Sequence, residues 1–156
     1  MPTELTPGAK APDFTLPRDG GSSVSLRDFK GKNLVVFFYP KADTSGCTKE
    51  AMDFSELRAA FAKAGATVLG VSADPVEAQD AFKAKHDLKV ALASDEERKM
   101  IEAYGAWGKK SMYGRSYMGI LRTTFLIGAD GRVAQVWRNV KVPGHAEAVL
   151  AAVRQL

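Results

Sequence analysis

Two unbroken runs of apolar, β-forming residues dominate the hydrophobic pattern, Leu34–Tyr39 and Ala66–Val71. Runs without polar alternation are typical of strands that are buried on both faces of a sheet. Between the runs, Phe54, Leu57 and Phe61 recur at helical spacing among charged residues, which predicts an amphipathic helix. A strand, a helix and a second strand in this order predict a right-handed crossover and a parallel pair.

The rest of the chain continues as an α/β pattern. Asp74–Glu77 and Ser94–Glu97 resemble capping boxes, so each predicts the start of a helix. The segments 123–127 and 132–137 are strand-like and enclose a Gly- and Asp-containing turn, which predicts an antiparallel hairpin. Pro143 is predicted to start the last helix. The order favours a mixed sheet flanked by helices, for which a thioredoxin-like α/β fold is the best match.

Length and charge narrow the function classes. The chain has 156 residues, of which 46% are apolar, so we expect one domain over residues 1–156. The formal net charge is only +4, from 22 basic and 18 acidic residues. The most basic stretch, Arg98–Arg122, is predicted to be mostly a solvated face. We therefore expect no nucleic-acid partner.

The chain shows no targeting signal. Met1–Lys10 lacks the apolar run of a signal peptide. The longest apolar run, Leu34–Pro40, is too short to cross a bilayer, so we expect no membrane association. A single cysteine rules out an internal disulfide and fits a reducing compartment. The expected location is the cytoplasm.

Metal and nucleotide sites are not supported by the sequence. His86 and His145 are the only histidines, and with one cysteine they make a poor ligand set. Both are expected to be surface or capping residues. The segment Gly105–Ser111 only superficially resembles a phosphate-binding loop, because the required Gly-Lys-Ser/Thr is missing. No metal and no cofactor is expected.

Cys47 is the candidate for chemistry. It follows a buried strand and a polar loop, and it is predicted to lie in the first turn of the next helix. Unpaired N–H groups and the positive end of the helix dipole there favour the thiolate, which is the nucleophilic form. A lone cysteine in an α/β protein is also commonly an inert apolar residue. On local physics alone, these two interpretations are about equally good.

The residues around Cys47 resemble those of a known family. Pro40, Thr44 and Cys47 match the spacing P-x-x-x-T-x-x-C of the peroxiredoxin active-site loop. The flanking residues and the downstream segment resemble the bacterioferritin-comigratory, or Q-type, subfamily, and the opening residues resemble peroxiredoxin N-termini. These segments are 37–41, 46–50, 113–127 and 8–14.

The resemblance implies a thiol-dependent peroxidase that reduces hydrogen peroxide and organic hydroperoxides. Cys47 would attack the peroxide and become sulfenic acid. Thr44 would hydrogen-bond the thiolate and the peroxide, Pro40 would shield the thiolate from water, and Arg122 would stabilise the thiolate and orient the peroxide. From the residues alone, Thr44 is equally compatible with a helix cap and Pro40 with a strand terminator.

One departure from the subfamily matters for the reaction. Many Q-type members have a second cysteine five residues after the first, where this chain has Met52, and the following helix contains no cysteine either. The chain therefore resembles a one-cysteine variant. An external thiol reductant is expected: thioredoxin, glutaredoxin or a small thiol. The resemblance also implies a monomer.

Three other functions share features with this sequence. Disulfide exchange of the thioredoxin kind is excluded because no second cysteine follows in a C-x-x-C arrangement. A glutathione-peroxidase-like enzyme fits the fold, but the segment around Arg122 matches peroxiredoxins better. A redox sensor that passes oxidation to a partner remains an alternative. Turnover with a physiological thiol would favour the enzyme, whereas slow reversal and a captured partner would favour the sensor.

Overall fold

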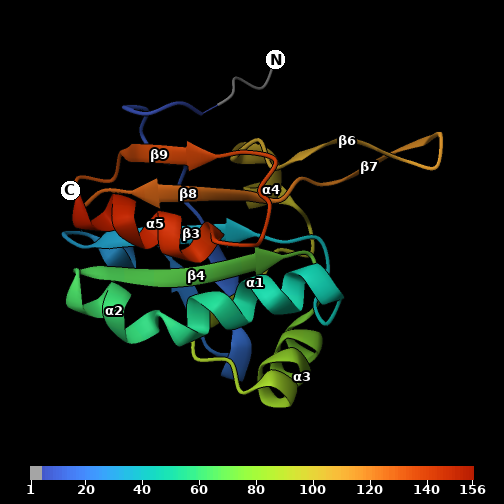
Figure 1. Cartoon of the computed structure of the whole chain (residues 1–156), viewed down its shortest axis with the longest axis horizontal. Coiled ribbons are helices and arrows are strands. Elements are labelled where there is room, and N and C mark those ends of the chain that lie inside the picture. The colour runs from blue at the N-terminus through green and yellow to red at the C-terminus, as the bar shows by residue number, and fades with distance from the viewer. Residues whose placement is uncertain (1–4) are drawn as a thin grey trace.

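The centre of the fold is a five-stranded mixed β-sheet, present in a computed structural model that describes residues 5–156 (Figure 1). Residues 1–4, part of the segment expected to carry no signal sequence, lie outside the described residues. The strand order across the sheet is β5-β4-β3-β8-β9. These strands are β3 (Asn33–Phe38), β4 (Ala66–Ser72), β5 (Ala91–Ser94), β8 (Thr123–Ile127) and β9 (Val133–Trp137).

The pairing of the strands follows the predicted pattern. β3 runs parallel to β4, with Val36 opposite Leu69. On its other side β3 is antiparallel to β8, with Val36 opposite Phe125. β8 and β9 form the expected antiparallel hairpin. The prediction of a mixed sheet with a central parallel pair is confirmed.

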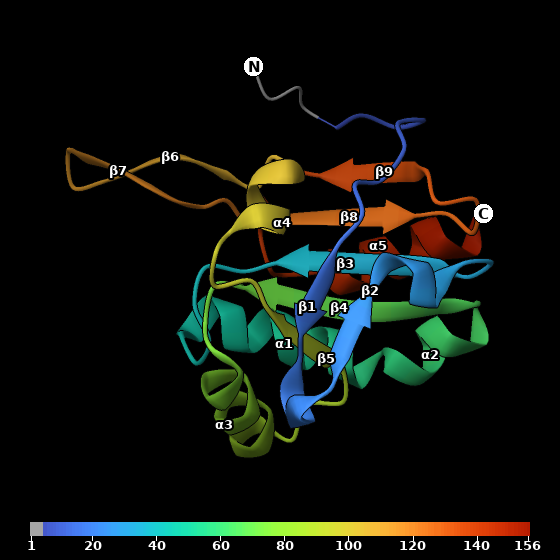
Figure 2. The same cartoon turned by 180° about the vertical axis from the view of Figure 1, so that it is seen from behind.

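Helices cover both faces of the sheet (Figures 1 and 2). Alternate residues of β3 point to opposite faces, Val35 and Phe37 into one core cluster and Val36 and Phe38 into the other. The first cluster lies under α1 (Ser45–Glu56), α2 (Arg58–Lys63), α3 (Val76–His86) and α5 (His145–Arg154). The second lies under α4 (Lys99–Ala103) and a small sheet of β1 (Thr15–Pro17) and β2 (Ser23–Ser25), accompanied by the short 3-10 helices η1 (Asp19–Gly21) and η2 (Leu26–Phe29). Within residues 5–156, no helix is long and apolar enough to cross a membrane.

The helix predicted between β3 and β4 is interrupted. α1 ends at Glu56 and α2 begins at Arg58, with Leu57 between them at φ −94° and ψ 3°. Phe54 and Phe61 are nevertheless both fully buried in the same core cluster. The prediction of a helical segment with one apolar face is confirmed, and the segment is divided into two helices because the backbone bends at Leu57.

The predicted cap at Asp74 is also wrong. α3 begins at Val76, after Pro75, and it has no side-chain cap. The Asp74 carboxylate instead accepts a hydrogen bond from the backbone N–H of Ala42 at 2.8 Å. This carboxylate is used to hold the loop that follows β3.

The two later helices begin further along than predicted. α4 begins at Lys99, although the Asp95 carboxylate still accepts a hydrogen bond from the N–H of Ile101 at 2.8 Å. α5 begins at His145 and not at Pro143. In each case the chain makes one extra turn before the helix starts.

A β-hairpin that the sequence analysis did not predict projects from the body of the protein (Figures 1 and 2). It consists of β6 (Trp107–Met112) and β7 (Arg115–Ile120), joined at Tyr113 and Gly114. Both of these residues have positive φ, 53° and 77°. Two positive φ values suit the twist of a two-residue hairpin turn, but Tyr-Gly is not a strong sequence signal for one.

Candidate active site

The loop between β3 and α1 is held from the α3 side. The Asp74 carboxylate accepts one hydrogen bond from the Ala42 N–H and another, at 2.6 Å, from the Ser72 hydroxyl. Asp43 has a φ of 62° and pairs at 2.8 Å with both Lys85 and His86 near the end of α3. The loop therefore has a fixed conformation where it leads into α1.

Tyr39 adds a buried anchor beneath this loop. Its hydroxyl donates to the side-chain carbonyl of Gln79, and Gln79 donates at 2.9 Å to the Ser72 hydroxyl and to the Ala93 carbonyl. Tyr39 and Gln79 are both fully buried, and every polar side-chain group in this network has a partner. Burial raises the pKa of Tyr39, so its hydroxyl remains a neutral donor. The network ties the end of β3 to α3 and β5.

Cys47 lies in the first turn of α1, as predicted. It is the third residue of the helix, and its residue surface is only 1% exposed. It packs in the core cluster that also contains Tyr39, Ala42 and Phe54. The first N–H groups of a helix have no partner within the helix, and the helix dipole is positive there. The position therefore favours a negatively charged sulfur atom.

Arg122 is brought to Cys47 from a distant part of the sequence. It lies between β7 and β8, and its Nη2 donates to the Cys47 Sγ at 3.3 Å, although the two residues are 75 positions apart. Its Nη1 donates to Glu50 Oε1 at 2.6 Å. The planar guanidinium thus bridges a sulfur and a carboxylate, which a lysine could not do with the same geometry. The predicted proximity of Cys47 and Arg122 is present.

Glu50 was not singled out from the sequence, although it lies inside the motif that was recognised. It is three residues after Cys47 in α1, which places both side chains on one face of the helix. Glu50 is 1% exposed, and its Oε2 has no hydrogen-bond partner. Burial raises the pKa of this carboxyl group to about 7, and the charge of Arg122 only partly opposes that effect. The signal for Glu50 in the sequence was an acidic residue at helical spacing from the candidate nucleophile Cys47.

Gly46 provides the space for the guanidinium. A Cβ at this position would lie 3.2 Å from Arg122 Nη2, the atom that contacts the sulfur. A side chain here would push the guanidinium, which contacts Cys47, by a few tenths of an ångström. The glycine was part of the recognised motif, but only the structure gives it this role.

Thr44 and Pro40 flank the site, and within residues 5–156 neither side chain donates a hydrogen bond to the Cys47 sulfur. The Thr44 hydroxyl donates to the Lys41 carbonyl at 2.8 Å. Thr44 is also the residue before α1, where its side chain makes no capping bond. Its hydroxyl must turn if it is to donate to the thiolate. Pro40 lies two residues beyond the end of β3 and is half-buried.

His145 differs from its expectation as a surface or capping residue. It is buried at the start of α5, and its Nε2 is 2.8 Å from the Thr124 hydroxyl. Its ring makes edge contacts with Phe54 and Trp137. Burial, and secondarily the charge of Arg122, lowers the pKa of His145 to about 4, so the ring is neutral near pH 7.

Lys110, in the β6–β7 hairpin, interacts electrostatically with the site. Its Nζ donates to the Ile120 carbonyl at 3.0 Å. Burial, with the neighbouring charge of Arg122, lowers the pKa of Lys110, whereas the charge of Cys47 acts in the opposite direction. The base of the hairpin therefore contributes to the electrostatic field around Cys47 and Arg122.

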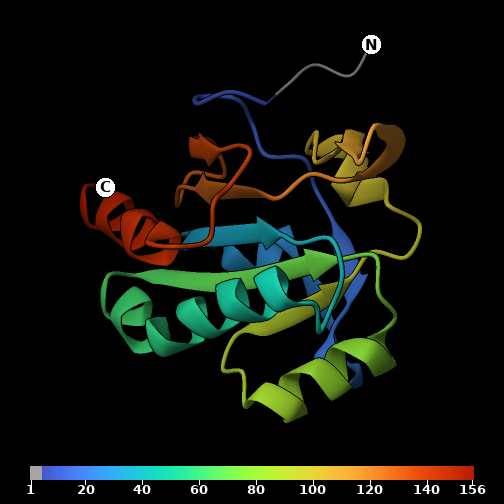
Figure 3. The ribbon, with the colours of Figure 1, turned by 45° about the vertical axis from the view of Figure 1, so that its right-hand side comes forward.

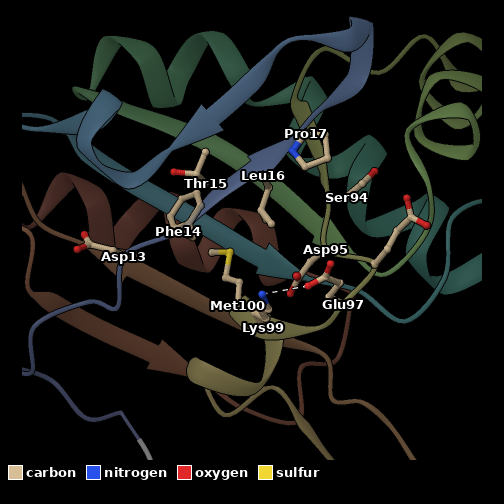
Figure 4. Close-up of a pocket in the computed structure, with 11 residues that line it drawn as sticks. Asp13, Phe14, Thr15, Leu16, Pro17, Ser94, Asp95, Glu97, Lys99 and Met100 are labelled. Atoms are coloured by element: carbon tan, nitrogen blue, oxygen red, sulfur yellow. Dashed lines mark ion pairs between the residues drawn. The ribbon is translucent and has the colours of Figure 1, made fainter.

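A cavity of about 680 Å³ lies away from this site (Figure 4). Its walls come from the β1 segment and from the residues leading into α4, including Leu16, Asp95 and Met100. None of the residues that contact Cys47 lines it. The arrangement around Cys47 is a compact site in which the sulfur, a guanidinium and a carboxyl group lie together.

Comparisons with known proteins agree with this geometry. A model of the AhpC/TSA family matches residues 7–136. The chain is 45% identical to peroxiredoxin Bcp of Bacillus subtilis over 96% of its length and 95% of the relative. It is 42% identical to peroxiredoxin Bcp of Escherichia coli, covering 94% of each chain.

Solved structures give the same answer for the fold. Peroxiredoxin Q of Xanthomonas campestris superposes with a TM-score of 0.90 at 44% identity, covering 96% of this chain and 97% of the other. A cysteine-to-serine mutant of PrxQ from Xylella fastidiosa superposes with a TM-score of 0.93 at 37% identity, covering 98% of each chain. The prediction of a thioredoxin-like fold is confirmed by these neighbours.

Proposed function

Because this chain belongs to the AhpC/TSA family and is a thiol peroxidase of the Bcp, or Q-type, peroxiredoxins, we propose that Cys47 is the residue that attacks the peroxide. One observation carries the proposal. The only cysteine lies in the first turn of α1, and the half-buried guanidinium of Arg122 donates to its sulfur at 3.3 Å. A positive group and a helix N-terminus both stabilise the thiolate.

The proposed chemistry has two stages. The Cys47 thiolate attacks the terminal oxygen of ROOH, the O–O bond breaks, and the products are sulfenic acid and RO⁻. The RO⁻ takes a proton from solvent to give an alcohol, or water when the substrate is hydrogen peroxide. A thiol then condenses with the sulfenic acid to form a mixed disulfide and water, and a second thiol releases Cys47 in its reduced form.

Each neighbouring residue has a distinct proposed role. Arg122 stabilises the thiolate and orients the peroxide, while Glu50 fixes the position of Arg122. Thr44 turns its hydroxyl from the Lys41 carbonyl to the bound peroxide, and Pro40 shields the thiolate from water. The developing charge on the departing oxygen is best stabilised by donors that are already in position, and the guanidinium supplies them.

The substrates include hydrogen peroxide and organic hydroperoxides. A Xanthomonas campestris bacterioferritin comigratory protein, described with alkyl peroxide reduction activity, is 43% identical to this chain and superposes with a TM-score of 0.90. The absence of a second cysteine from the sequence requires the reducing thiol to come from outside the chain. Thioredoxin, glutaredoxin or a small thiol can supply it. The enzyme acts as a cytoplasmic monomer with one domain over residues 1–156 and without a metal or cofactor.

A peroxide-consumption assay with a panel of thiols tests the proposal. Wild-type protein and Cys47→Ser are compared with hydrogen peroxide and an alkyl hydroperoxide, using dithiothreitol, thioredoxin and glutaredoxin as donors. We expect turnover by the wild type and a loss of at least about a thousand-fold in the variant, because the nucleophile is gone. Circular dichroism checks that Cys47→Ser is folded. Consumption at the wild-type rate by the folded variant would show that another group reacts with peroxide.

A further inference from the structure

The β6–β7 hairpin exposes an unusual set of side chains for a segment that projects into solvent. Tyr113 is 97% exposed, Tyr117 44% and Met118 54%. Among the described residues these are three of the five large hydrophobic side chains that are exposed. Tyrosine, methionine and arginine are enriched in the contact surfaces of protein partners.

The charge of the hairpin has one sign. Lys109 and Arg115 are exposed, and Lys110 is half-buried at the base. The segment 107–121 contains no aspartate and no glutamate. A surface with this charge is complementary to an acidic protein face, which it would attract before contact.

The hairpin lies beside the site that needs an external thiol. It extends on the same side of the molecule as the N-terminal end of α1, where Cys47 lies (Figure 1). The chain runs from the end of β7 at Ile120 through Leu121 to Arg122, whose guanidinium contacts the Cys47 sulfur. A protein bound to the hairpin is therefore held close to Cys47. Figure 3 views this side of the molecule more directly.

We propose that the β6–β7 hairpin is the docking surface for a protein dithiol reductant with an acidic face, which it delivers to oxidised Cys47. The inference rests on the proposed function of Cys47. One thiol of the partner condenses with the Cys47 sulfenic acid, forming a mixed disulfide and water. The second thiol of the partner then attacks the partner's other sulfur, the one bonded to Cys47 in the mixed disulfide. This releases reduced Cys47 and leaves an internal disulfide in the partner.

A small thiol needs no docking surface, and this difference provides the test. The charge-reversed variant Lys109→Glu/Arg115→Glu and the apolar variant Tyr113→Ser/Tyr117→Ser are compared with wild type. Thioredoxin and glutaredoxin, each with its recycling system, and dithiothreitol serve as reductants. The matched control is Arg58→Glu/Lys63→Glu, which reverses two exposed charges on α2, at the opposite end of the molecule from the hairpin.

We expect both hairpin variants to lower kcat/KM for at least one protein reductant, mainly by raising KM. Charge reversal should lower kcat/KM by at least about tenfold at low salt. The difference between wild type and the charge-reversed variant should shrink as salt is added. The rate with dithiothreitol and all rates of the α2 control should stay unchanged. Single-turnover oxidation by hydrogen peroxide, without any reductant, should be the same in every protein.

Several results would overturn the docking proposal. It fails if kcat/KM for both protein reductants is unchanged in the hairpin variants, or if neither protein reduces the oxidised wild type. It also fails if wild type sediments as a dimer that the hairpin variants dissociate while all thiols slow equally, because the hairpin would then join two copies. If single-turnover oxidation of wild-type Cys47 is absent, the proposed function fails, independently of docking.

Discussion

Arg122 and Arg115 lie close together in the sequence and show how differently two regions of this protein use a positive charge. Arg122 is partly buried between Cys47 and Glu50, and both ends of its guanidinium have partners. Arg115 is exposed on the β6–β7 hairpin, one residue beyond the turn. The first charge acts over hydrogen-bond distance on one sulfur atom. The second is fully hydrated, so it acts at longer range and is screened by salt.

The contrast separates catalysis from recognition. The Cys47 site is fixed by burial and by the hydrogen bonds of Arg122 to Cys47 and Glu50, so small displacements should alter its chemistry. The hairpin contributes little buried apolar surface beyond its base, so changes at its tip should leave the fold unaffected. Substitutions in matched pairs can therefore test whether the two regions are independent.

The largest effect is expected when Arg122→Ala is compared with Arg115→Ala. Arg122→Ala removes the donor to Cys47, and we expect the rate of peroxide reaction to fall by about 10²–10³-fold. It also leaves Glu50 buried without its partner, at a cost of about 1–3 kcal/mol in the free energy of unfolding. Arg115→Ala should change neither quantity. Stopped-flow oxidation and urea unfolding measure the two effects.

Arg122→Lys sharpens this result. Lysine keeps the positive charge but cannot bridge Glu50 and Cys47 with a planar fork, so its rate should lie between those of wild type and Arg122→Ala. If Arg122→Ala oxidises as fast as wild type, Arg122 has only a structural role.

The next effect concerns the pH dependence of stability, tested with Glu50→Gln. The folded-state pKa of Glu50 is raised from its ordinary value of 4.5 to about 7 by burial. Between these values the folded protein binds more protons than the unfolded chain, so stability from this group is present below 4.5 and is lost as the pH rises through 7. Relative to Glu50→Gln, the free energy of unfolding of wild type should fall by on the order of 2 kcal/mol between pH 5 and pH 8.

Urea unfolding at both pH values measures this difference. Glu102→Gln, at an exposed position on α4, is the matched control and should follow wild type. His145 has the opposite dependence, because its lowered pKa makes stability fall as the pH drops from 6.5 toward 4, but this background is common to all three proteins. Parallel pH curves for wild type and Glu50→Gln would contradict a raised pKa at Glu50.

A smaller effect is expected for Gly46→Ala. The new Cβ would lie 3.2 Å from Arg122 Nη2, so the guanidinium must shift by a few tenths of an ångström. We expect the oxidation rate to fall by up to about tenfold. The free energy of unfolding should change by less than about 1 kcal/mol, because alanine is the better helix former. Ser45→Ala, at the exposed neighbouring position, should leave the rate unchanged.

The smallest effect is expected at the tip of the hairpin. Tyr113→Ser removes a side chain that is 97% exposed. The free energy of unfolding should stay within about 0.5 kcal/mol of wild type, and single-turnover oxidation should be unchanged. A loss of stability or of oxidation rate in this variant would show that the two regions are coupled and not independent.

Sequence reasoning succeeded where a strong local pattern decides the structure. The apolar runs of β3 and β4, the Gly-rich turn between β8 and β9, and the position of Cys47 after a buried strand are all set by short segments. Arg122 was placed by resemblance alone, because no local pattern connects it to a cysteine 75 residues away.

The remaining differences come from tertiary contacts. Asp74 resembled a helix cap, but its carboxylate binds the Ala42 N–H instead. His145 resembled a surface residue, yet α5 buries it against Thr124. The β6–β7 hairpin escaped prediction because its strands are polar and its turn is Tyr113-Gly114. For Asp74 and His145, the partner lies too far along the chain for a local pattern to reveal it.

The central claim is that Cys47 is the residue that peroxide oxidises, and that it depends on an outside thiol for its recovery. The most direct measurement treats the protein with hydrogen peroxide in the absence of thiol and analyses its peptides by mass spectrometry, with a sulfenic-acid trapping reagent in a parallel sample. Met52, which is 38% exposed, can also gain an oxygen, so the trap and the peptide assignment are both needed.

With limited peroxide, we expect the trap to label Cys47 and added dithiothreitol to restore the free thiol. With excess peroxide, Cys47 should gain two and then three oxygen atoms and become inactive, because the sequence provides no second cysteine to form a protecting disulfide. If peroxide is consumed while Cys47 keeps its free thiol and never reacts with the trap, the account of this protein as a one-cysteine peroxidase acting through Cys47 is contradicted.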